Sequence, residues 1–371
     1  MEISKSIFQI PNILMVLFAF IYVITDLVQM PTLIGNMLVA LVGLCSFFYV
    51  FVKRRKTWVV ERVTLYAILL TFCMIISILY NNNANITNIL WIWGYLGIAL
   101  VLWICRLSST ALFGIYYSVA LIFLIYALQG RNPQEVLSSG SGNNISTIVM
   151  YFMLVAYLNK YKKQCPLPYT PALVFIIISL WGNGRAGLLT SLLFFLLIFL
   201  YNFIYMKKGK PKTLIILFII LMFGGYFINH FFSAAILQYQ YKMERYGMDS
   251  VRTEIWKEYL QGTLSNIGNF FFGVSTKDTV YPKLSYYGGN THNAFLMLHS
   301  KFGIIGLMIF MINTVLAGVK SLKTKDYVFF NTISVVVFRS FFDWTAFPGI
   351  FDIFFWIMII YVGDKKTRDN I

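Results

Sequence analysis

The chain has 371 residues, of which 59% are hydrophobic and 12% are charged, and its formal net charge is +16. Soluble domains usually carry about a quarter charged residues, so this composition excludes an ordinary soluble protein. The basic excess would suit a nucleic-acid-binding protein, but most of it lies in short loops between apolar runs, which argues against that class.

Long apolar runs recur along the whole chain, and runs of roughly 20 such residues are typical of transmembrane helices. The runs are continuous rather than alternating, which favours helices over a membrane barrel. We expect an all-α polytopic membrane protein with a single integral membrane domain over residues 1–371. About twelve spans are predicted, over residues 7–28, 31–52, 63–80, 89–105, 110–128, 145–159, 169–182, 187–205, 213–232, 293–319, 327–342 and 349–362.

Lysine and arginine alternate between abundant and scarce from one loop to the next. The rich set includes both termini and the segments 53–62, 160–163, 207–212 and 320–325. The positive-inside rule places this set in the cytoplasm, and twelve spans then put both termini there. The longest polar stretch, residues 233–289, becomes a large external loop between the ninth and tenth spans.

Neither a disulfide nor a metal site is predicted. None of the four cysteines falls in a predicted external loop, and their spacing does not match a zinc site. The carboxylates predicted to be external show no Asp-x-Asp pair that could hold a divalent ion. We therefore expect no metal and no other cofactor.

Lysine and arginine residues in external loops or inside spans are exceptions to the positive-inside rule. The position of each such residue therefore needs a local explanation. Arg185 is one, in "SLWGNGRAGLL", at a predicted outer turn between two spans. Gly182, Gly184 and Gly187 bring backbone close to it, and successive N–H groups in such turns can cradle an anion. The alternative is a tight turn with an arginine that extends to the membrane surface.

The external loop contains "MDSVRTEIWKEYLQG", which predicts an amphipathic helix that starts near residue 249 and stops at Gly262. Such a helix could lie on the membrane interface, with Trp256 and Tyr259 as aromatic anchors. That interpretation leaves Arg252 without a role.

A second helix start is predicted in "GGNTHNAFLMLHSKFGIIGL", residues 288–307, with Asn290 or Thr291 as its cap. His292 would lie in the first turn, where a helix N-terminus lowers the pKa of a histidine and leaves it able to accept a proton. His299, seven residues on, is expected to be buried in the bundle. The alternative is a capped helix whose histidine has only a structural role.

Arg339 lies near the outer end of a span, in "FRSFFDWTAFPGIFD". Asp343 follows four residues on, so a structural ion pair is the simplest account. An arginine inside a membrane span is nevertheless a candidate functional residue.

Together these segments resemble the O-antigen ligase and polymerase superfamily of bacterial membrane glycosyltransferases. The resemblance rests on "GNGRAGLL", "VRTEIWKEYL" and "THNAFLMLHSKFGIIGL", in this order, and covers about residues 170 to 355. The final "RSFFDWTAFPGIFD" is similar to the tail of the polysaccharide polymerases in that group.

The resemblance implies a glycosyltransferase-C-like (GT-C-like) membrane enzyme that polymerises glycan repeat units carried by undecaprenyl pyrophosphate. Transfer would be metal-independent and inverting, at the outer face of the bacterial cytoplasmic (inner) membrane, and would build O-antigen of lipopolysaccharide or a capsular or secreted polysaccharide. Expected partners are the lipid-linked donor and acceptor glycans and membrane lipid, with a chain-length regulator and a flippase as further candidates.

The resemblance also assigns roles to residues. His292 would activate the acceptor hydroxyl. Arg185 and Arg252 would hold the diphosphate, because a guanidinium group can form two parallel hydrogen bonds to phosphate oxygens. The expected substrate-binding residues are Arg339, Asn293, Trp256 and Arg245.

Three alternatives stay open. A ligase of the same superfamily would move finished glycan onto lipid A-core or protein. A twelve-helix transporter or flippase would show two related halves with matching helix breaks, which this sequence does not show. A structural membrane protein would not need basic residues on the outer side.

Overall fold

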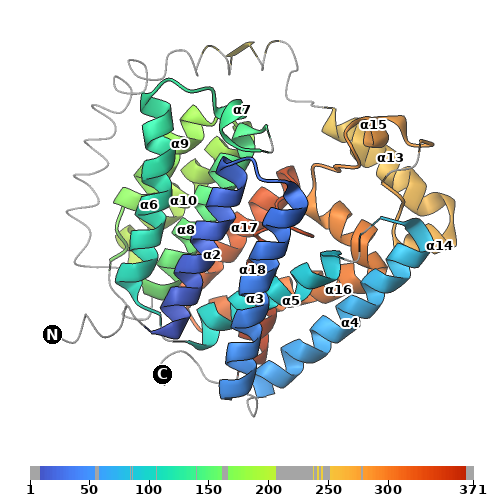
Figure 1. Ribbon diagram of the computed structural model, residues 1–371, viewed down its shortest axis with the longest axis horizontal. Helices are drawn as coiled ribbons and strands as arrows, with labels where there is room; N and C mark the ends of the chain where they lie inside the picture. Colours follow the sequence, from blue (N-terminus) through green and yellow to red (C-terminus); the bar gives the residue numbers. More distant parts are fainter. Residues whose placement is uncertain are drawn as a thin grey trace.

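The computed structural model describes residues 9–54, 58–83, 85, 87–105, 107–138, 140–160, 166–205, 237, 240–241, 244, 251–276 and 279–364. These ranges fold into helices that differ widely in length (Figure 1). The helices are α2 (Ile10–Leu27), α3 (Thr32–Arg54), α4 (Trp58–Asn81), α5 (Thr87–Ile104), α6 (Ser109–Leu128), α7 (Pro133–Val136), α8 (Gly142–Lys160), α9 (Thr170–Trp181), α10 (Arg185–Tyr205), α13 (Arg252–Ser265), α14 (Ile267–Phe272), α15 (Pro282–Tyr286), α16 (Ala294–Lys323), α17 (Tyr327–Phe342) and α18 (Asp352–Gly363).

The chain is an all-α, multi-pass membrane protein by helix length and hydropathy. Among the described residues, seven helices are long and apolar enough to cross a membrane, and α9, α17 and α18 are shorter apolar helices. A helix covers most of each predicted span, with ends that differ by a few residues, except over residues 213–232. That predicted span lies outside the described residues.

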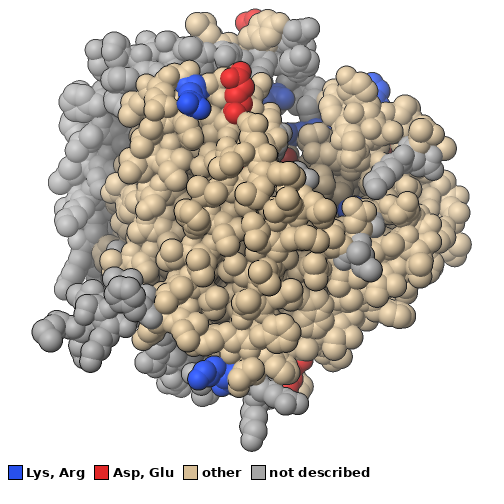
Figure 2. Space-filling model, viewed as in Figure 1, with Lys and Arg blue, Asp and Glu red and all other residues tan. Residues whose placement is uncertain are grey.

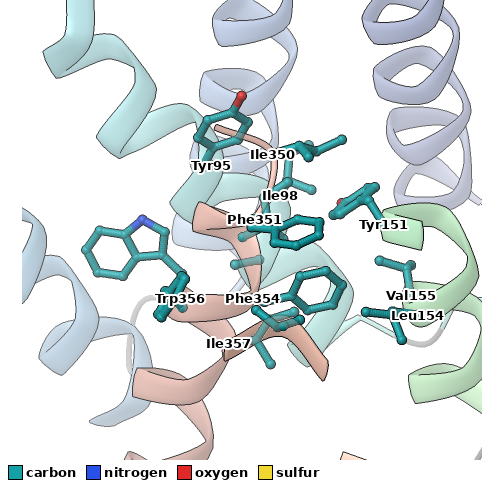
Figure 3. Close-up of a cluster of buried hydrophobic side chains, with 14 of the residues drawn as sticks. Tyr95, Ile98, Tyr151, Leu154, Val155, Ile350, Phe351, Phe354, Trp356 and Ile357 are labelled. Atoms are coloured by element: carbon teal, nitrogen blue, oxygen red, sulfur yellow. The ribbon is translucent and has the colours of Figure 1, made fainter. Parts of the chain in front are cut away.

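Helix α18 forms the centre of the bundle. Nearly all of its side chains are buried, and a helix that is apolar all round needs neighbours on every face. Figure 3 shows Phe354 of α18 beside Tyr151 of α8, and Ile98 of α5 close to Phe351. The rings of Tyr151 and Phe354 meet edge to face with centroids 5.5 Å apart. This core joins the early helices to the late ones.

Small residues bring α3 and α5 into close contact. A Cβ added to Gly97 would meet the carbonyl oxygen of Gly43 and lie 2.6 Å from the backbone nitrogen of Phe47. Glycine at such a crossing lets the two backbones approach directly, which favours helix association in a membrane. The crossing holds α5 beside the N-terminal helices.

Hydrogen bonds between elements tie the bundle together at different places. Lys320 donates to the carbonyl of Tyr361 over 2.7 Å, and Trp103 donates to the Asp364 carboxylate over 3.1 Å. Trp181 donates to the carbonyl of Arg131 over 3.1 Å. The first two contacts join segments predicted to be cytoplasmic, and the third joins segments predicted to be external.

Candidate active site

Four separate helix ends place charged or titratable side chains near one another. Arg185 begins α10, Arg252 begins α13, His292 directly precedes the N-cap of α16, and Asp343 directly follows α17. The charges of Asp343 and Arg185 both act on Arg252, and those of Arg252 and Asp343 both act on His292. We call these four residues the Arg–His cluster. Of the residues predicted to be catalytic, Arg252 and His292 thus lie within electrostatic range of each other and of Asp343, and Arg185 lies within range of Arg252.

The cluster lies at the end of the molecule that carries the α13–α15 segment. Figure 2 shows a largely uncharged surface over the bundle, with basic and acidic side chains at its two ends and in a hollow beside this segment. Arg185, Arg252 and His292 are half-buried, and Asp343 is buried. Partial burial strengthens the attraction of such a site for a negatively charged group.

Burial lowers the pKa of Arg252, the Asp343 carboxylate opposes this effect, and the charge of Arg185 lowers the pKa further. An arginine stays protonated at neutral pH even so. Asp343 already pairs with Arg339, so the charges of Arg185 and Arg252 leave a net positive site. Asp343 does not neutralise this positive charge, so the site can bind an additional anion.

The backbone around His292 holds the side chain in an unusual position. His292 has φ 49°, in the left-handed region, and its backbone N–H donates to the Asn290 side-chain oxygen over 2.7 Å. The Tyr287 ring meets the imidazole edge to face at 5.8 Å. The Nδ1 atom of His292 is buried, and no described residue hydrogen-bonds to it. A buried polar atom without a partner is a candidate for contact with a ligand.

The pKa of His292 is lowered, as the sequence predicts, but the expected cause is wrong. His292 lies before the helix cap rather than in the first turn. Burial lowers its pKa most, the Arg252 charge lowers it further, and Asp343 raises it. The imidazole is therefore mainly neutral at pH 7 and can accept a proton.

Asn293, not Asn290 or Thr291, caps α16. Its side-chain oxygen accepts from the backbone N–H groups of Phe295 at 2.9 Å and Leu296 at 3.1 Å. Its amide nitrogen donates to the carbonyl of Phe341 over 3.2 Å. These bonds tie the segment before α16 to the end of α17, so Asn293 positions His292 relative to Asp343.

Helix α13 is not a free interfacial helix. Its apolar face contributes Ile255 and Tyr259 to a small core with Val274 and Leu284. The Trp256 indole donates to the carbonyl of Thr291 over 2.8 Å. Trp256 and Tyr259 are therefore internal contacts rather than membrane anchors, and Trp256 holds α13 against the segment that carries His292.

His299 is buried, as predicted, and both of its ring nitrogens have partners. Nδ1 lies 2.8 Å from the Tyr259 hydroxyl, and Nε2 lies 2.8 Å from the carbonyl of Phe270. The second histidine of the motif thus joins α16 to α13 and α14. Its role is structural.

Gly262 does not stop α13, which continues to Ser265 and ends at Asn266. Asn266 instead caps the next helix by accepting from the Gly268 N–H at 2.6 Å. A Cβ at Gly262 would lie 2.6 Å from the Tyr281 hydroxyl oxygen. This glycine therefore serves close packing between α13 and α15, not helix termination.

The glycine turn beside Arg185 packs closely against α8, and the predicted anion cradle stays a prediction. A Cβ at Gly184 or Gly187 would run into Asn143 or Ser146 of α8. The N–H groups of Gly182 and Asn183 close the end of α9 by bonding to the carbonyls of residues 178 and 180. The turn is packed against α8, and Arg185 itself is its functional candidate.

Arg339 forms the predicted ion pair with Asp343, at 3.1 Å. Its side chain is 1% exposed, and the same nitrogen donates to the carbonyl of Asn143 over 3.1 Å and to the Thr147 hydroxyl over 3.2 Å. These contacts fix Asp343 and α8 beside the cluster. These contacts give Arg339 a positioning role, and its expected contact with substrate stays a prediction.

Arg245 lies outside the described residues. Within the described ranges, no group of three or more histidine, cysteine or acidic residues could hold a metal ion. The sequence interpretation missed Asp343 as a neighbour of Arg252 and His292, and it missed Tyr287. No local signal marks either residue, because the contacts join segments far apart in the chain.

Comparison with models of known protein families and with curated protein sequences finds no match. The function is therefore argued from the geometry and chemistry of the cluster.

Proposed function

We propose that the chain is a polysaccharide polymerase of the O-antigen polymerase type. It would join oligosaccharide repeat units carried by undecaprenyl pyrophosphate, at the outer face of the bacterial cytoplasmic membrane. The observation that carries this proposal is the Arg–His cluster, in which two arginines and a mainly neutral histidine meet at one end of an apolar bundle. That combination suits a reaction with an anionic leaving group and a hydroxyl acceptor.

The chemistry requires charge stabilisation and a proton acceptor. The acceptor hydroxyl oxygen forms a bond to the anomeric carbon of the donor sugar, from the face opposite the leaving group. The bond from that carbon to the pyrophosphate oxygen breaks, and its electron pair leaves with undecaprenyl pyrophosphate. Arg185 and Arg252 would stabilise this developing charge. His292 would take the hydroxyl proton.

The proposed membrane arrangement has twelve spans with both termini in the cytoplasm. Residues 233–289 then form an external loop between the ninth and tenth spans. The lysine and arginine content of the loops supports this arrangement. It puts the Arg–His cluster on the outer side, where lipid-linked repeat units become available after translocation.

The test is polymerisation by purified protein in liposomes supplied with lipid-linked repeat units. We expect a ladder of glycan lengths that survives EDTA, because the arginines replace a metal ion as the charge stabiliser. Arg185→Ala should abolish the ladder. Lys283→Ala should leave it intact, because Lys283 is an exposed external cation that pairs with Glu254 at 2.9 Å.

Three outcomes would count against the proposal. Loss of activity with EDTA and recovery with magnesium would show that a metal ion, rather than the arginines, stabilises the leaving group. Transfer of preformed polymer to lipid A-core, without any ladder, would identify a ligase. Translocation of lipid-linked glycan without bond formation would identify a flippase.

A further inference from the structure

A polar pocket lies between the early helices and the segments that carry the Arg–His cluster. It has a volume of about 480 Å³, within the range of roughly 300–1,000 Å³ that holds small ligands. A second cavity of about 230 Å³ shares several of its lining residues, among them Asp26 and Trp344. We call the two together the polar pocket. The reaction proposed above uses none of these lining residues.

The pocket is lined by amide and aromatic side chains. Asn36 and Asn88 supply groups that both donate and accept hydrogen bonds, whereas the amide of Asn83, a third lining residue, already bonds to the backbone. Trp91 and Tyr95 form one wall, with ring centroids 4.8 Å apart and planes tilted by 35°. Amides beside aromatic faces suit a ligand that has hydroxyl groups on an otherwise apolar ring.

The charges in the pocket do not favour a phosphate. Asp26 and Lys301 are its only charged lining residues in the part of the chain that the structure describes. Asp26 accepts a hydrogen bond from the Ser138 hydroxyl, and Lys301 donates to the carbonyl of Asn83. One charge of each sign leaves no net attraction for an anion. The pocket therefore differs in kind from the cationic cluster beside it.

Two buried polar groups on the pocket wall have no partner. The Thr345 hydroxyl and the Trp344 indole N–H are buried and make no hydrogen bond to any described residue. Thr345 is 4% exposed, and both residues line the smaller cavity. A buried polar group without a partner costs free energy, so each such group needs an explanation. A ligand in the pocket supplies one.

The pocket shares two walls with the cluster. Gly288 and Gly289 line it and lie four and three residues before His292. Trp344 lines it too, directly follows Asp343, and donates its backbone N–H to that carboxylate over 3.0 Å. A molecule in the pocket is thus next to the segments that place the proposed base.

We infer that the polar pocket binds neutral sugars of the acceptor glycan, beside the hydroxyl that reacts. This inference rests on the proposed function. The reacting hydroxyl of an acceptor repeat unit lies at the end remote from its own pyrophosphate, so the sugars around it carry no diphosphate charge. The Arg–His cluster holds the donor diphosphate, and the polar pocket selects the acceptor sugar by hydrogen bonds to its hydroxyls.

The test measures binding of the free repeat-unit oligosaccharide, released from its lipid pyrophosphate by mild acid, to the protein in nanodiscs. Thr345→Val and Trp344→Phe each remove one unpartnered donor and keep most of the side-chain volume. Each should weaken oligosaccharide binding roughly ten-fold, the worth of one hydrogen bond to a buried group. Thermal stability should stay unchanged or rise slightly, because neither group has a partner among the residues that the structure describes.

Two variants serve as controls. Ser179→Ala removes another buried hydroxyl without a described partner, outside the pocket, and should leave binding unchanged. Arg185→Ala should abolish polymerisation but keep the oligosaccharide affinity.

The outcomes separate the two proposals. Equal binding by wild type, Thr345→Val and Trp344→Phe would overturn the sugar site, as would a wild-type protein that polymerises yet does not bind the oligosaccharide. Loss of binding in Arg185→Ala would show that the pocket is not separate from the cluster. A wild type that binds the oligosaccharide in the expected pattern but never polymerises would keep the sugar site and reject the polymerase.

Discussion

The protonation of His292 depends on two neighbours with opposite charge. Arg252 lowers the pKa of the imidazole and Asp343 raises it, while burial lowers it most. If His292 accepts the acceptor proton, it must be neutral. Activity should therefore fall as the pH drops through the pKa of His292, which lies below its ordinary value of 6.5.

This dependence gives a signed prediction for the acid limb of the pH profile. Arg252→Gln removes the positive charge, raises the pKa of His292 and should move the limb to higher pH. Asp343→Asn removes the negative charge and should move it to lower pH. The two shifts should have opposite sign, because the two charges act on the imidazole in opposite directions. The measurement is kcat/KM against pH, and a limb that stays in place in both variants would exclude His292 as the titrating base.

Substitutions of the histidine and of the arginines should also differ in their effect on donor binding. His292→Ala should reduce turnover roughly 10²–10⁴-fold, the usual contribution of general acid–base catalysis, with donor affinity almost unchanged. Arg185→Lys and Arg252→Lys should weaken donor binding as well as turnover, because an ammonium group cannot reproduce the bidentate geometry. Donor affinity and polymer formation are measured separately on variants of equal expression. Normal polymerisation by His292→Ala would leave only a structural role for the segment before α16.

At the residue scale, the sequence points to candidate residues but not to all of their surroundings. Arg185, Arg252 and His292 stand out because charge and titratable groups are rare in this chain. Asp343 beside Arg252 and His292 could not be predicted, because its obvious partner is Arg339, four residues away. Asn293 was expected to bind substrate. Its hydrogen bond to Phe341, 48 residues away, indicates a positioning role, and a contact over that sequence distance is visible only in the folded structure.

At the scale of elements, hydropathy predicts where helices form because a membrane span is a local property of the chain. The segment 251–289 is different, since its helices are short and its apolar residues pack on one another. Trp256 and Thr291 are 35 residues apart, and their hydrogen bond decides that α13 packs on the segment before α16. The amphipathic pattern of α13 alone could not distinguish a helix that packs on another part of the protein from one that lies on the membrane surface.

The crossing of α3 and α5 can be tested with two glycines. Gly97→Ala should destabilise the fold by about 1–3 kcal/mol, because its Cβ would overlap backbone atoms of α3 that cannot move aside. Gly114→Ala is the matched control, since Gly114 lies in α6 with nothing within 4 Å of the added Cβ. That substitution should be neutral or stabilising, because alanine favours a helix. The midpoint of thermal unfolding in detergent measures both, and equal midpoints would contradict the close crossing.

At the scale of the whole molecule, the buried helix α18 joins early and late helices into one body around the cluster. Sequence alone left the early spans without a role, since the resemblance covers only about residues 170 to 355. In the structure Trp91 and Tyr95 of α5 line a pocket whose other wall includes Gly289 and Trp344. The early helices thus help form the pocket that we assign to the acceptor sugar. Such a pocket leaves no motif, because its residues come from separate parts of the chain.

The orientation of the molecule in the membrane is the last prediction. Ser265 is the last residue of α13 and Lys323 the last residue of α16, and both are exposed. Single cysteines at these positions, in a background without the four native cysteines, can be probed with a membrane-impermeant thiol reagent. Ser321, in the last turn of α16, is fully buried and would not react. The positive-inside rule predicts labelling at 265 in cells whose outer barrier is opened, and labelling at 323 only after the cytoplasmic membrane is broken. The reverse pattern would put the Arg–His cluster in the cytoplasm and rule out polymerisation at the outer face.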